Sequence, residues 1–194
     1  IDAWHIEADD GTHEGLENLN ASASGQPSLG GISVLCDEIK TVSKEGANIY
    51  IVDLREESHG FADNFPVSFY VEKNRGNFYS GYSEEKELEQ LESLTDFFPL
   101  GTANKKLLKP QKFSPQKIST EKSAVTAENC IYVRFPATDM IFPAPQVVDK
   151  FLVFVKSLRQ NDWVHFHCQA GHGRTTTFLV MYDILKNPNL SLEE

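Results

Sequence analysis

The sequence has 194 residues, of which 40% are hydrophobic and 24% are charged, values ordinary for a single globular domain with its own core. The net charge of −10 argues against nonspecific nucleic-acid binding, and no apolar run approaches the ~20 residues that span a bilayer. No signal peptide is visible at the start of the sequence, which begins with Ile1 instead of Met, and we expect the chain to be a fragment of a longer protein.

The first half of the chain predicts a helix and a buried strand in succession. Residues 1–31 are polar and rich in Gly, Ser and Asn, which favours irregular structure. Apolar residues at helical spacing predict a helix over 32–44, and the β-branched run 48–54 predicts a buried strand. Residues 60–82 favour loop with short strands. A hydroxyl cap and acidic first turn predict a helix beginning at Ser83.

The second half shows two further strands, each followed by a helix. Residues 95–129 have no clear period, whereas 130–135 predicts a strand. Pro145 suits the first position of an amphipathic helix. The run 163–167 predicts a third strand, and 174–186 a final helix.

The alternation of strands and helices predicts an α/β fold with a mainly parallel sheet flanked by helices. Ligands of such folds sit beyond the carboxyl ends of the strands. Cys168 follows the strand over 163–167 directly and precedes the last helix, so we expect it at that edge of the sheet.

Three widely spaced cysteines, Cys36, Cys130 and Cys168, do not form a disulfide framework or a CxxC zinc motif. Cys36 and Cys130 fall within apolar patterns and are expected to be small buried hydrophobic residues. Cys168 differs because of its neighbours.

The segment 105–122 carries six Lys and one Glu, a local charge of +5 in an otherwise acidic chain. A solvated lysine-rich loop is one interpretation of this segment. Collection of anionic ligands is the other.

The sequence that joins the third strand to the last helix has the properties of a phosphate-binding loop. It runs His167-Cys168-Gln169-Ala170-Gly171-His172-Gly173-Arg174-Thr175. Gly171 and Gly173 permit backbone angles that other residues resist, so successive N–H groups can turn inward and form an anion nest. The helix N-terminus adds its free amides, and Arg174 supplies a planar fork for two phosphate oxygens.

The positive potential of the helix N-terminus and of Arg174 favours the thiolate form of Cys168, which is the nucleophilic form. Thr175 can donate its hydroxyl to the sulfur. We expect His167 to order the loop from beneath through backbone contacts, and His172 to face the mouth of the site. Two simpler interpretations remain open. One is a strand-to-helix turn that happens to contain a cysteine, and the other is a pocket that binds phosphate without turnover.

Displacement of an alkoxide by a thiolate requires a proton donor, which a carboxylic acid on a separate loop can provide. Asp139 follows the strand over 130–135 and lies within Phe135-Pro136-Ala137-Thr138-Asp139-Met140-Ile141-Phe142-Pro143. It is therefore the candidate general acid at the same sheet edge.

Several strings of the sequence resemble one family, the bacterial protein-tyrosine-phosphatase-like phytases, or cysteine phytases. The matching strings are the phosphate loop, Asp53-Leu54-Arg55-Glu56-Glu57-Ser58-His59-Gly60, Pro66-Val67-Ser68, Ala137-Thr138-Asp139, and residues 15–25. The resemblance spans roughly residues 14–190.

The resemblance implies a tyrosine-phosphatase fold with a small partial β-barrel beside it, to which residues 60–82 and 95–129 contribute within a single domain. It implies stepwise hydrolysis of myo-inositol hexakisphosphate, or of lower inositol phosphates, through a phosphocysteine, with no cofactor and no metal. It also favours a secreted or periplasmic bacterial location.

Carried over by position, Cys168 is the nucleophile, Arg174 binds the phosphoryl group and Asp139 is the acid and then the base. The amides from Gln169 to Arg174, including those of Ala170, Gly171, His172 and Gly173, line the pocket. The string Phe98-Pro99-Leu100-Gly101 suggests Lys105 or Lys106 as substrate contacts. For Arg55 and His59, substrate contact and an ion-paired structural role beneath the loop both remain open.

The sequence departs from the family where members often carry His and Trp after the acid, because Met140 and Phe142 stand there. Three alternatives therefore remain. They are a protein tyrosine or dual-specificity phosphatase, a phosphoinositide phosphatase, and a phosphate-reading module without turnover.

Overall fold

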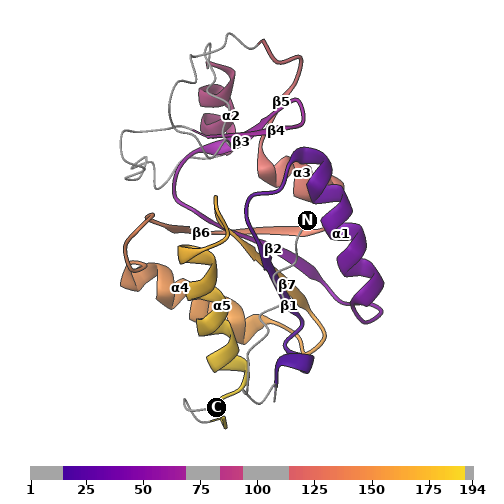
Figure 1. Ribbon diagram of the computed structural model, residues 1–194, viewed down its shortest axis with the longest axis vertical. Helices are drawn as coiled ribbons and strands as arrows, with labels where there is room; N and C mark the ends of the chain where they lie inside the picture. Colours follow the sequence, from indigo (N-terminus) through magenta and orange to yellow (C-terminus); the bar gives the residue numbers. More distant parts are fainter. Residues whose placement is uncertain (1–14, 69–83, 94–113, 191–194) are drawn as a thin grey trace.

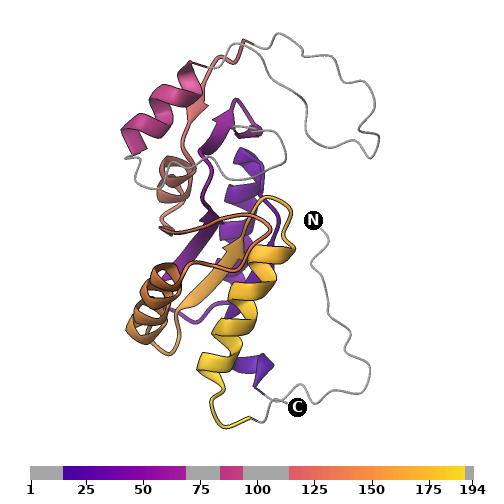
Figure 2. The same cartoon turned by 90° about the vertical axis from the view of Figure 1, so that its left-hand side faces the viewer.

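The structure, a computed structural model, describes residues 15–68, 84–93 and 114–190 (Figures 1 and 2). Within these residues the main sheet has four parallel strands in the order β1-β7-β2-β6. The bounds of its strands are β1 Ala21–Ser24, β2 Ile49–Arg55, β6 Ile131–Ala137 and β7 Trp163–His167. The predicted mainly parallel α/β sheet is confirmed.

Helices cover both faces of this sheet (Figure 1). Two helices pack on one face, α4 Pro145–Ser157 and α5 Gly173–Lys186. Two others pack on the opposite face, α1 Leu29–Val42 and α3 Glu121–Ala127. Among the described residues, no helix is both long and apolar enough to span a membrane.

Alternation along the strands assigns each side chain to one of the two cores. Val164 and Phe166 of β7 join the core beneath α4 and α5, where Phe151 contacts four aromatic rings. His165 and His167 therefore point to the face that α1 and α3 cover. On that face Ile49 and Ile51 of β2 join the second core, whereas Asp53 and Arg55 at the carboxyl end of the same strand are buried polar residues.

A second, three-stranded sheet lies beyond that end of the main sheet (Figure 1). Its strands pair antiparallel in the order β4-β3-β5, and α2 packs on it. The bounds are β3 His59–Ala62, β4 Phe65–Ser68, β5 Ile118–Ser119 and α2 Glu84–Glu92.

Most predicted elements are confirmed to within a few residues, and the strand over 163–167 is confirmed without a shift. Cys36 and Cys130 are buried and free, as expected.

Two stretches, one expected to be irregular and one without a clear period, contain regular elements that were not predicted individually. The first, 1–31, contains a 3-10 turn over Leu16–Asn18 and strand β1. β1 carries only Ala and Ser, and hydrogen bonds between His165 and the hydroxyls of Ser22 and Ser24 tie it to β7, so no hydrophobic period marks it. The second, 95–129, contains β5 and α3, which are too short to show a period.

Candidate active site

The candidate phosphate loop connects β7 to α5 and packs against the chain that follows β1. Gly171 has φ +77°, and a Cβ there would lie 2.6 Å from the backbone nitrogen of Gly25. The N–H of Gln26 donates to the carbonyl oxygen of Gln169 at 3.1 Å. The expectation for Gly171 is therefore met, but that for Gly173 is wrong, because Gly173 opens α5 and its φ is not positive.

Cys168 lies at the base of this loop with 3% of its surface exposed. Burial alone would raise the pKa of its thiol. The hydroxyl and N–H of Thr175, the charge of Arg174 and the N–H of Gly171 together outweigh burial, and the pKa falls below its ordinary value. The local geometry thus favours the thiolate, the form in which cysteine is a nucleophile.

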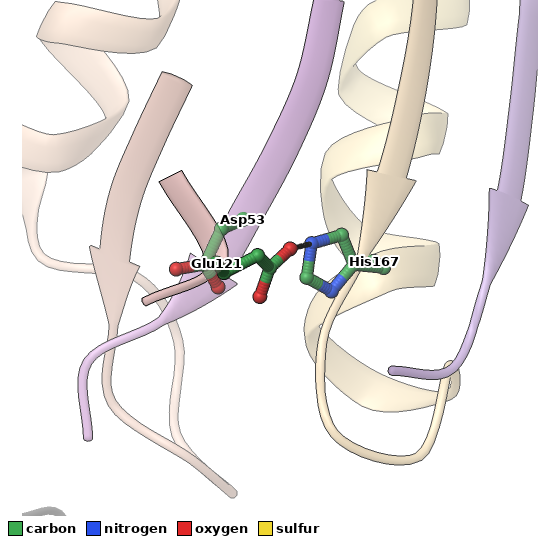
Figure 3. A group of neighbouring side chains, drawn as sticks. All are labelled: Asp53, Glu121 and His167. Carbon is green, nitrogen blue, oxygen red and sulfur yellow. Dashed lines mark ion pairs between the residues drawn. The ribbon is translucent and has the colours of Figure 1, made fainter. Parts of the chain in front are cut away.

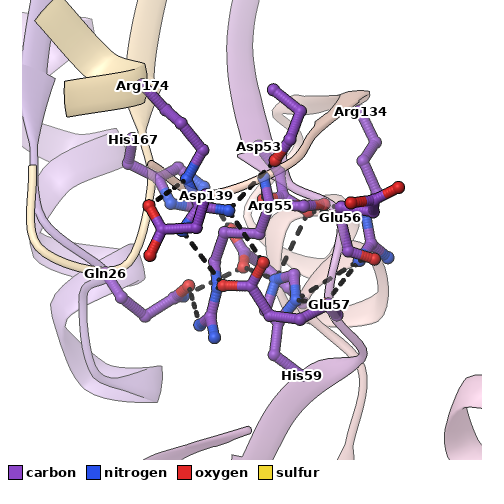
Figure 4. A network of polar contacts seen from close by, with 12 residues as sticks. Gln26, Asp53, Arg55, Glu56, Glu57, His59, Arg134, Asp139, His167 and Arg174 are labelled. Carbon is purple, nitrogen blue, oxygen red and sulfur yellow. Dashed lines mark hydrogen bonds and ion pairs between the residues drawn. The ribbon is translucent and has the colours of Figure 1, made fainter. Parts of the chain in front are cut away.

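Arg174 is held by a carboxylate that the sequence analysis did not single out. Its Nη1 donates to Oε2 of Glu57 at 2.7 Å and its Nη2 donates to Oε1 at 3.1 Å (Figure 4). Nη1 also donates to the carbonyl oxygen of Ala137 at 3.2 Å. Burial would raise the pKa of Glu57, but Arg55 and Arg174 together lower it below the ordinary range. The guanidinium is therefore fixed before any ligand binds.

Asp139 lies two residues beyond the end of β6, with its Oδ1 3.4 Å from Nε of Arg174. Among the described residues, this buried Nε has no hydrogen-bond acceptor, so it remains available as a donor. Thr138 donates its hydroxyl to Oε2 of Glu56 at 2.6 Å, which ties the start of the loop to the end of β2. The structure thus brings Asp139, Arg174 and Cys168 to one edge of the sheet.

The other candidate residues differ in how exposed they are. Gln169, Ala170 and His172 lie toward solvent, with Ala170 and His172 exposed. Arg55 and His59 are buried, at 2% and 1% exposure. Arg55 donates from Nε to Oε1 of Glu57 at 2.7 Å and from Nη1 to Oε1 of Gln26 at 3.1 Å, which favours the ion-paired role. Lys105 and Lys106 lie outside the described residues.

His167 faces a carboxylate rather than the loop backbone that we expected. Its Nε2 lies 2.6 Å from Oε1 of Glu121, the first residue of α3. Oε2 of Glu121 lies 2.9 Å from Nε2 of His59 and accepts a hydrogen bond of 2.9 Å from Nε2 of Gln26. Glu121 therefore joins three elements behind the loop.

Asp53, Glu121 and His167 place three potential metal-ligand atoms within 4.8 Å of one another (Figure 3). The oxygens of Asp53 already accept hydrogen bonds from the N–H of Arg55 at 2.8 Å and the hydroxyl of Tyr132 at 2.7 Å. Nε of Arg134 lies 3.1 Å from Oδ2 of the same carboxylate. Since Arg134 supplies the positive charge that a cation would bring, this group is an ion-pair cluster.

Glu57 and Glu121 were not predicted as site residues, for different reasons. Glu57 lies within residues 53–60, one of the strings that resemble the family. Its position two residues after Arg55 could have indicated an ion pair between the two side chains. Glu121 lies in a segment without hydrophobic periodicity. The one local indication of a helix there is Thr120, whose hydroxyl caps α3 by accepting a hydrogen bond from the N–H of Ser123.

This fold and loop agree with the comparisons to known proteins. Residues 72–186 match the model of the PTP-like phytase family, whose description reads inositol hexakisphosphate. The chain belongs to this family.

Similar solved structures include PTP-like phytases from two bacteria. Two structures from Mitsuokella multacida are 32% identical, cover 93% of this chain and 31% of theirs, and have TM-scores of 0.79 and 0.80. The second of these holds myo-inositol-(1,3,4,5)-tetrakisphosphate. A phytase from Bdellovibrio bacteriovorus is 35% identical, with a TM-score of 0.70, and covers 90% of this chain and 63% of its own.

A curated relative, effector protein hopD2 of Pseudomonas syringae pv. tomato, is 30% identical over 186 residues. The match covers 81% of this chain and 38% of the relative. The chain thus spans well under half the length of that relative and about a third of the Mitsuokella proteins.

Proposed function

We propose that this chain is a cysteine-dependent phosphatase that hydrolyses phosphate monoesters of myo-inositol polyphosphates. The observation that carries the proposal is the junction of β7 and α5. There a cysteine with a lowered pKa lies beside Arg174, which Glu57 holds in place. Membership of the PTP-like phytase family supports the same class of substrate.

In the proposed reaction the thiolate of Cys168 attacks phosphorus and forms a phosphocysteine. The bond to the leaving oxygen breaks as Asp139, in its acid form, donates its proton to that oxygen. The resulting carboxylate then takes a proton from water, which attacks phosphorus and releases inorganic phosphate and the thiolate of Cys168. No cofactor or metal enters either step.

The transferring phosphoryl group carries its charge on three oxygens, which N–H donors from the loop and the guanidinium of Arg174 would stabilise. Thr175 would donate its hydroxyl to the sulfur when Cys168 leaves phosphorus. The amides from Gln169 to Gly173 would line the pocket. His172, together with Lys105 or Lys106, would contact further phosphates of the substrate.

The Mitsuokella structure with a bound inositol tetrakisphosphate supports a small inositol phosphate as substrate. The lysine-rich segment 105–122 supports it further, because a substrate with several phosphates needs a basic mouth.

A second candidate function, hydrolysis of phosphotyrosine or other aryl phosphates, is favoured by the loop that carries the acid. Met140, Ile141 and Phe142 follow Asp139 and expose 83%, 65% and 80% of their surface. The leaving group must approach the acid, so its substituent meets these apolar side chains. An aromatic ring would pack on such a surface, whereas a ring of phosphates would gain little from it.

The test is phosphate release from myo-inositol hexakisphosphate and from a phosphotyrosine peptide at matched concentrations from pH 4 to 7, with Cys168→Ser as the blank. A preference for the inositol phosphate, lost on replacing Lys105 and Lys106 by Ala, supports the proposal. A preference for the peptide, reduced by Phe142→Ala, supports the second candidate. A folded protein that binds phosphate but is inactive on both would be the module without turnover.

A further inference from the structure

The loop that carries Asp139 is held in place near its first residues. The carbonyl oxygen of Ala137, the last residue of β6, accepts a hydrogen bond of 3.2 Å from Nη1 of Arg174. Oδ1 of Asp139 lies 3.4 Å from Nε of the same guanidinium, which is longer than a well-formed hydrogen bond, and 27% of this side chain is exposed. Residues 140–142 expose most of their surface, so packing contributes little there. The position of the acid therefore depends on the residues that precede it.

Thr138, the residue before Asp139, makes a short hydrogen bond to a residue at the end of the neighbouring strand. Its hydroxyl donates to Oε2 of Glu56 at 2.6 Å, across 82 positions of the sequence. Hydrogen bonds from a hydroxyl to a carboxylate are short and roughly twice as strong as those between neutral groups. Because Glu56 directly follows β2, this bond joins the ends of β2 and β6, which are adjacent strands of the main sheet.

The backbone that carries Glu56 is itself fixed. Arg134 of β6 donates to the carbonyl oxygens of the residues on either side of it. Its Nε bonds to the carbonyl oxygen of Arg55 at 2.8 Å, and its Nη2 bonds to that of Glu57 at 2.8 Å. The guanidinium is held in turn by Asp53, whose Oδ2 lies 3.1 Å from Nε. The carboxylate that accepts from the acid loop thus projects from a rigid segment.

Two consecutive carboxylates at the end of β2 therefore support the two parts of the candidate site (Figure 4). Glu57 holds the guanidinium of Arg174 by two hydrogen bonds. Glu56 holds the residue before Asp139. Since the two carboxylates belong to one segment of the chain, the phosphate-binding arginine and the acid are placed relative to each other by a common support.

We propose that Glu56 is a positioning residue for the general acid: by accepting the hydrogen bond of Thr138, it keeps Asp139 where its carboxyl group meets the leaving oxygen. The inference rests on the proposed role of Asp139 as the acid. Loss of the bond frees the start of the loop, so the leaving group departs without a proton in a larger share of turnovers. Phosphate binding and attack by the thiolate, which depend on Arg174 and Cys168, are left unchanged.

The test compares two substrates that differ in their need for a proton. The alkoxide of myo-inositol hexakisphosphate leaves only when protonated, whereas p-nitrophenolate leaves readily as an anion. Thr138→Val keeps the shape of the side chain but removes the hydroxyl. It should lower kcat on the inositol phosphate by ~5–30-fold, as for the loss of a partly exposed hydrogen bond to a charged group. On p-nitrophenyl phosphate kcat should fall by less than ~2-fold, and KM should be unchanged on both substrates.

Further variants assign the effect to this bond. Thr138→Ser keeps the hydroxyl and should retain kcat on the inositol phosphate within ~3-fold of the parent. Glu56→Ala removes the acceptor and should reproduce the result of Thr138→Val. Adding Thr138→Val to Asp139→Asn should cause no loss beyond that of Asp139→Asn alone, because both changes act on the same proton transfer.

Glu84→Ala is the matched control for Glu56→Ala. Its carboxylate also accepts a hydrogen bond from a threonine hydroxyl, that of Thr120 at 2.7 Å, but this bond joins α2 to the N-terminus of α3 instead of the acid loop. The ratio of kcat on the two substrates should therefore stay at the value of the parent protein.

Equal losses on the two substrates in Thr138→Val, or losses confined to KM, would overturn the inference and make the bond a purely structural contact. A further loss on adding Thr138→Val to Asp139→Asn would overturn it as well. If the parent hydrolyses both substrates and neither Thr138→Val nor Glu56→Ala changes the ratio, this inference fails alone.

A parent that hydrolyses p-nitrophenyl phosphate but not the inositol phosphate would refute the proposed substrate alone. Phenyl phosphate, whose leaving group is more basic, then replaces the inositol phosphate in the comparison. A larger loss on phenyl phosphate than on p-nitrophenyl phosphate in Thr138→Val supports the inference, and equal losses overturn it. A folded parent that is inactive on all three substrates would refute both the proposed function and this inference.

Discussion

Glu57 and Arg174 lie 117 residues apart and are joined by two hydrogen bonds of 2.7 and 3.1 Å. The pair connects the end of β2 to the first turn of α5 across the carboxyl edge of the sheet. Both side chains are almost completely buried, so their mutual charge compensates most of the cost of removing them from water. The guanidinium is therefore oriented by the fold before a phosphate arrives.

Glu57→Gln should lower kcat/KM by ~10–100-fold, because a hydrogen bond to a charged group contributes about 1.5–3 kcal/mol and the orientation of Arg174 depends on two of them. The amide can still accept one of the two bonds, so part of the function should remain. Steady-state kinetics on myo-inositol hexakisphosphate measure the effect. Glu89→Gln, on an exposed position of α2, is the matched control. Rates within two-fold of the parent would show that Arg174 is held by other contacts.

Asp139→Asn should reduce turnover of inositol phosphates by ~10²–10⁴-fold, since the leaving alkoxide then departs without a proton. p-Nitrophenol leaves readily as an anion, so its phosphate ester should lose less than ~10-fold. Comparing kcat for the two substrates in parent and variant measures this difference. Equal losses on both substrates would assign Asp139 to phosphate binding or loop structure, and no loss on either would place the acid elsewhere.

The difference between what the sequence predicted and what it missed has a physical origin. The β7–α5 loop was predicted because its signals are local: glycines, a helix start and a cysteine within nine residues. Glu57 and Glu121 were missed as site residues because their partners, Arg174 and His167, are distant in sequence. Nothing in a local pattern indicates that a carboxylate is buried against a histidine on another element.

The same distinction applies to the fold. Strands and helices with apolar periods were predicted, since burying an apolar face produces such a period. β1 was missed because small residues and two serine–histidine hydrogen bonds hold it in place. Local composition does not predict which glycine of the loop adopts a positive φ. In the packed loop Gly171 has a positive φ and Gly173 does not.

The buried ion pairs predict that the protein is most stable in mildly acidic solution. The folded pKa values of Glu57 and Glu121 lie below their ordinary 4.5, so the stability they contribute is present above pH 4.5 and is lost as the pH falls. The folded pKa of His167 lies above its ordinary 6.5, so its contribution is complete below pH 6.5 and is lost as the pH rises. All three contributions coexist between these two values.

Thermal unfolding from pH 3 to 9 should accordingly show its highest Tm between about pH 5 and 6.5. Between pH 5.5 and 3.5 the Tm should fall by about 5 °C or more, from the ~2–4 °C per kcal/mol expected at this chain length. Glu121→Gln should flatten the profile on both sides, because it removes one carboxylate and the cause of the raised histidine pKa. A Tm that keeps rising to pH 8 would contradict this account of the cluster.

The two glycines of the phosphate loop should respond oppositely to alanine. At Gly171 the positive φ and the contact of 2.6 Å with the backbone of Gly25 leave no room for a methyl group. The loop must then move away from the end of β1, and its N–H groups no longer converge. Gly171→Ala should therefore lower kcat by ~10²-fold or more, in line with the loss of a preorganised N–H donor, and lower stability by ~1–3 kcal/mol.

At Gly173 a Cβ would meet nothing within 4 Å, and the residue already has helical geometry at the start of α5. Alanine favours a helix over glycine by ~0.8–1.0 kcal/mol, so Gly173→Ala should keep activity within a few-fold and raise the Tm slightly. Kinetics and thermal unfolding of both variants measure the contrast. A large loss of activity in Gly173→Ala with a raised Tm would mean that the methyl group enters the space the phosphate occupies, since the fold itself would then be intact.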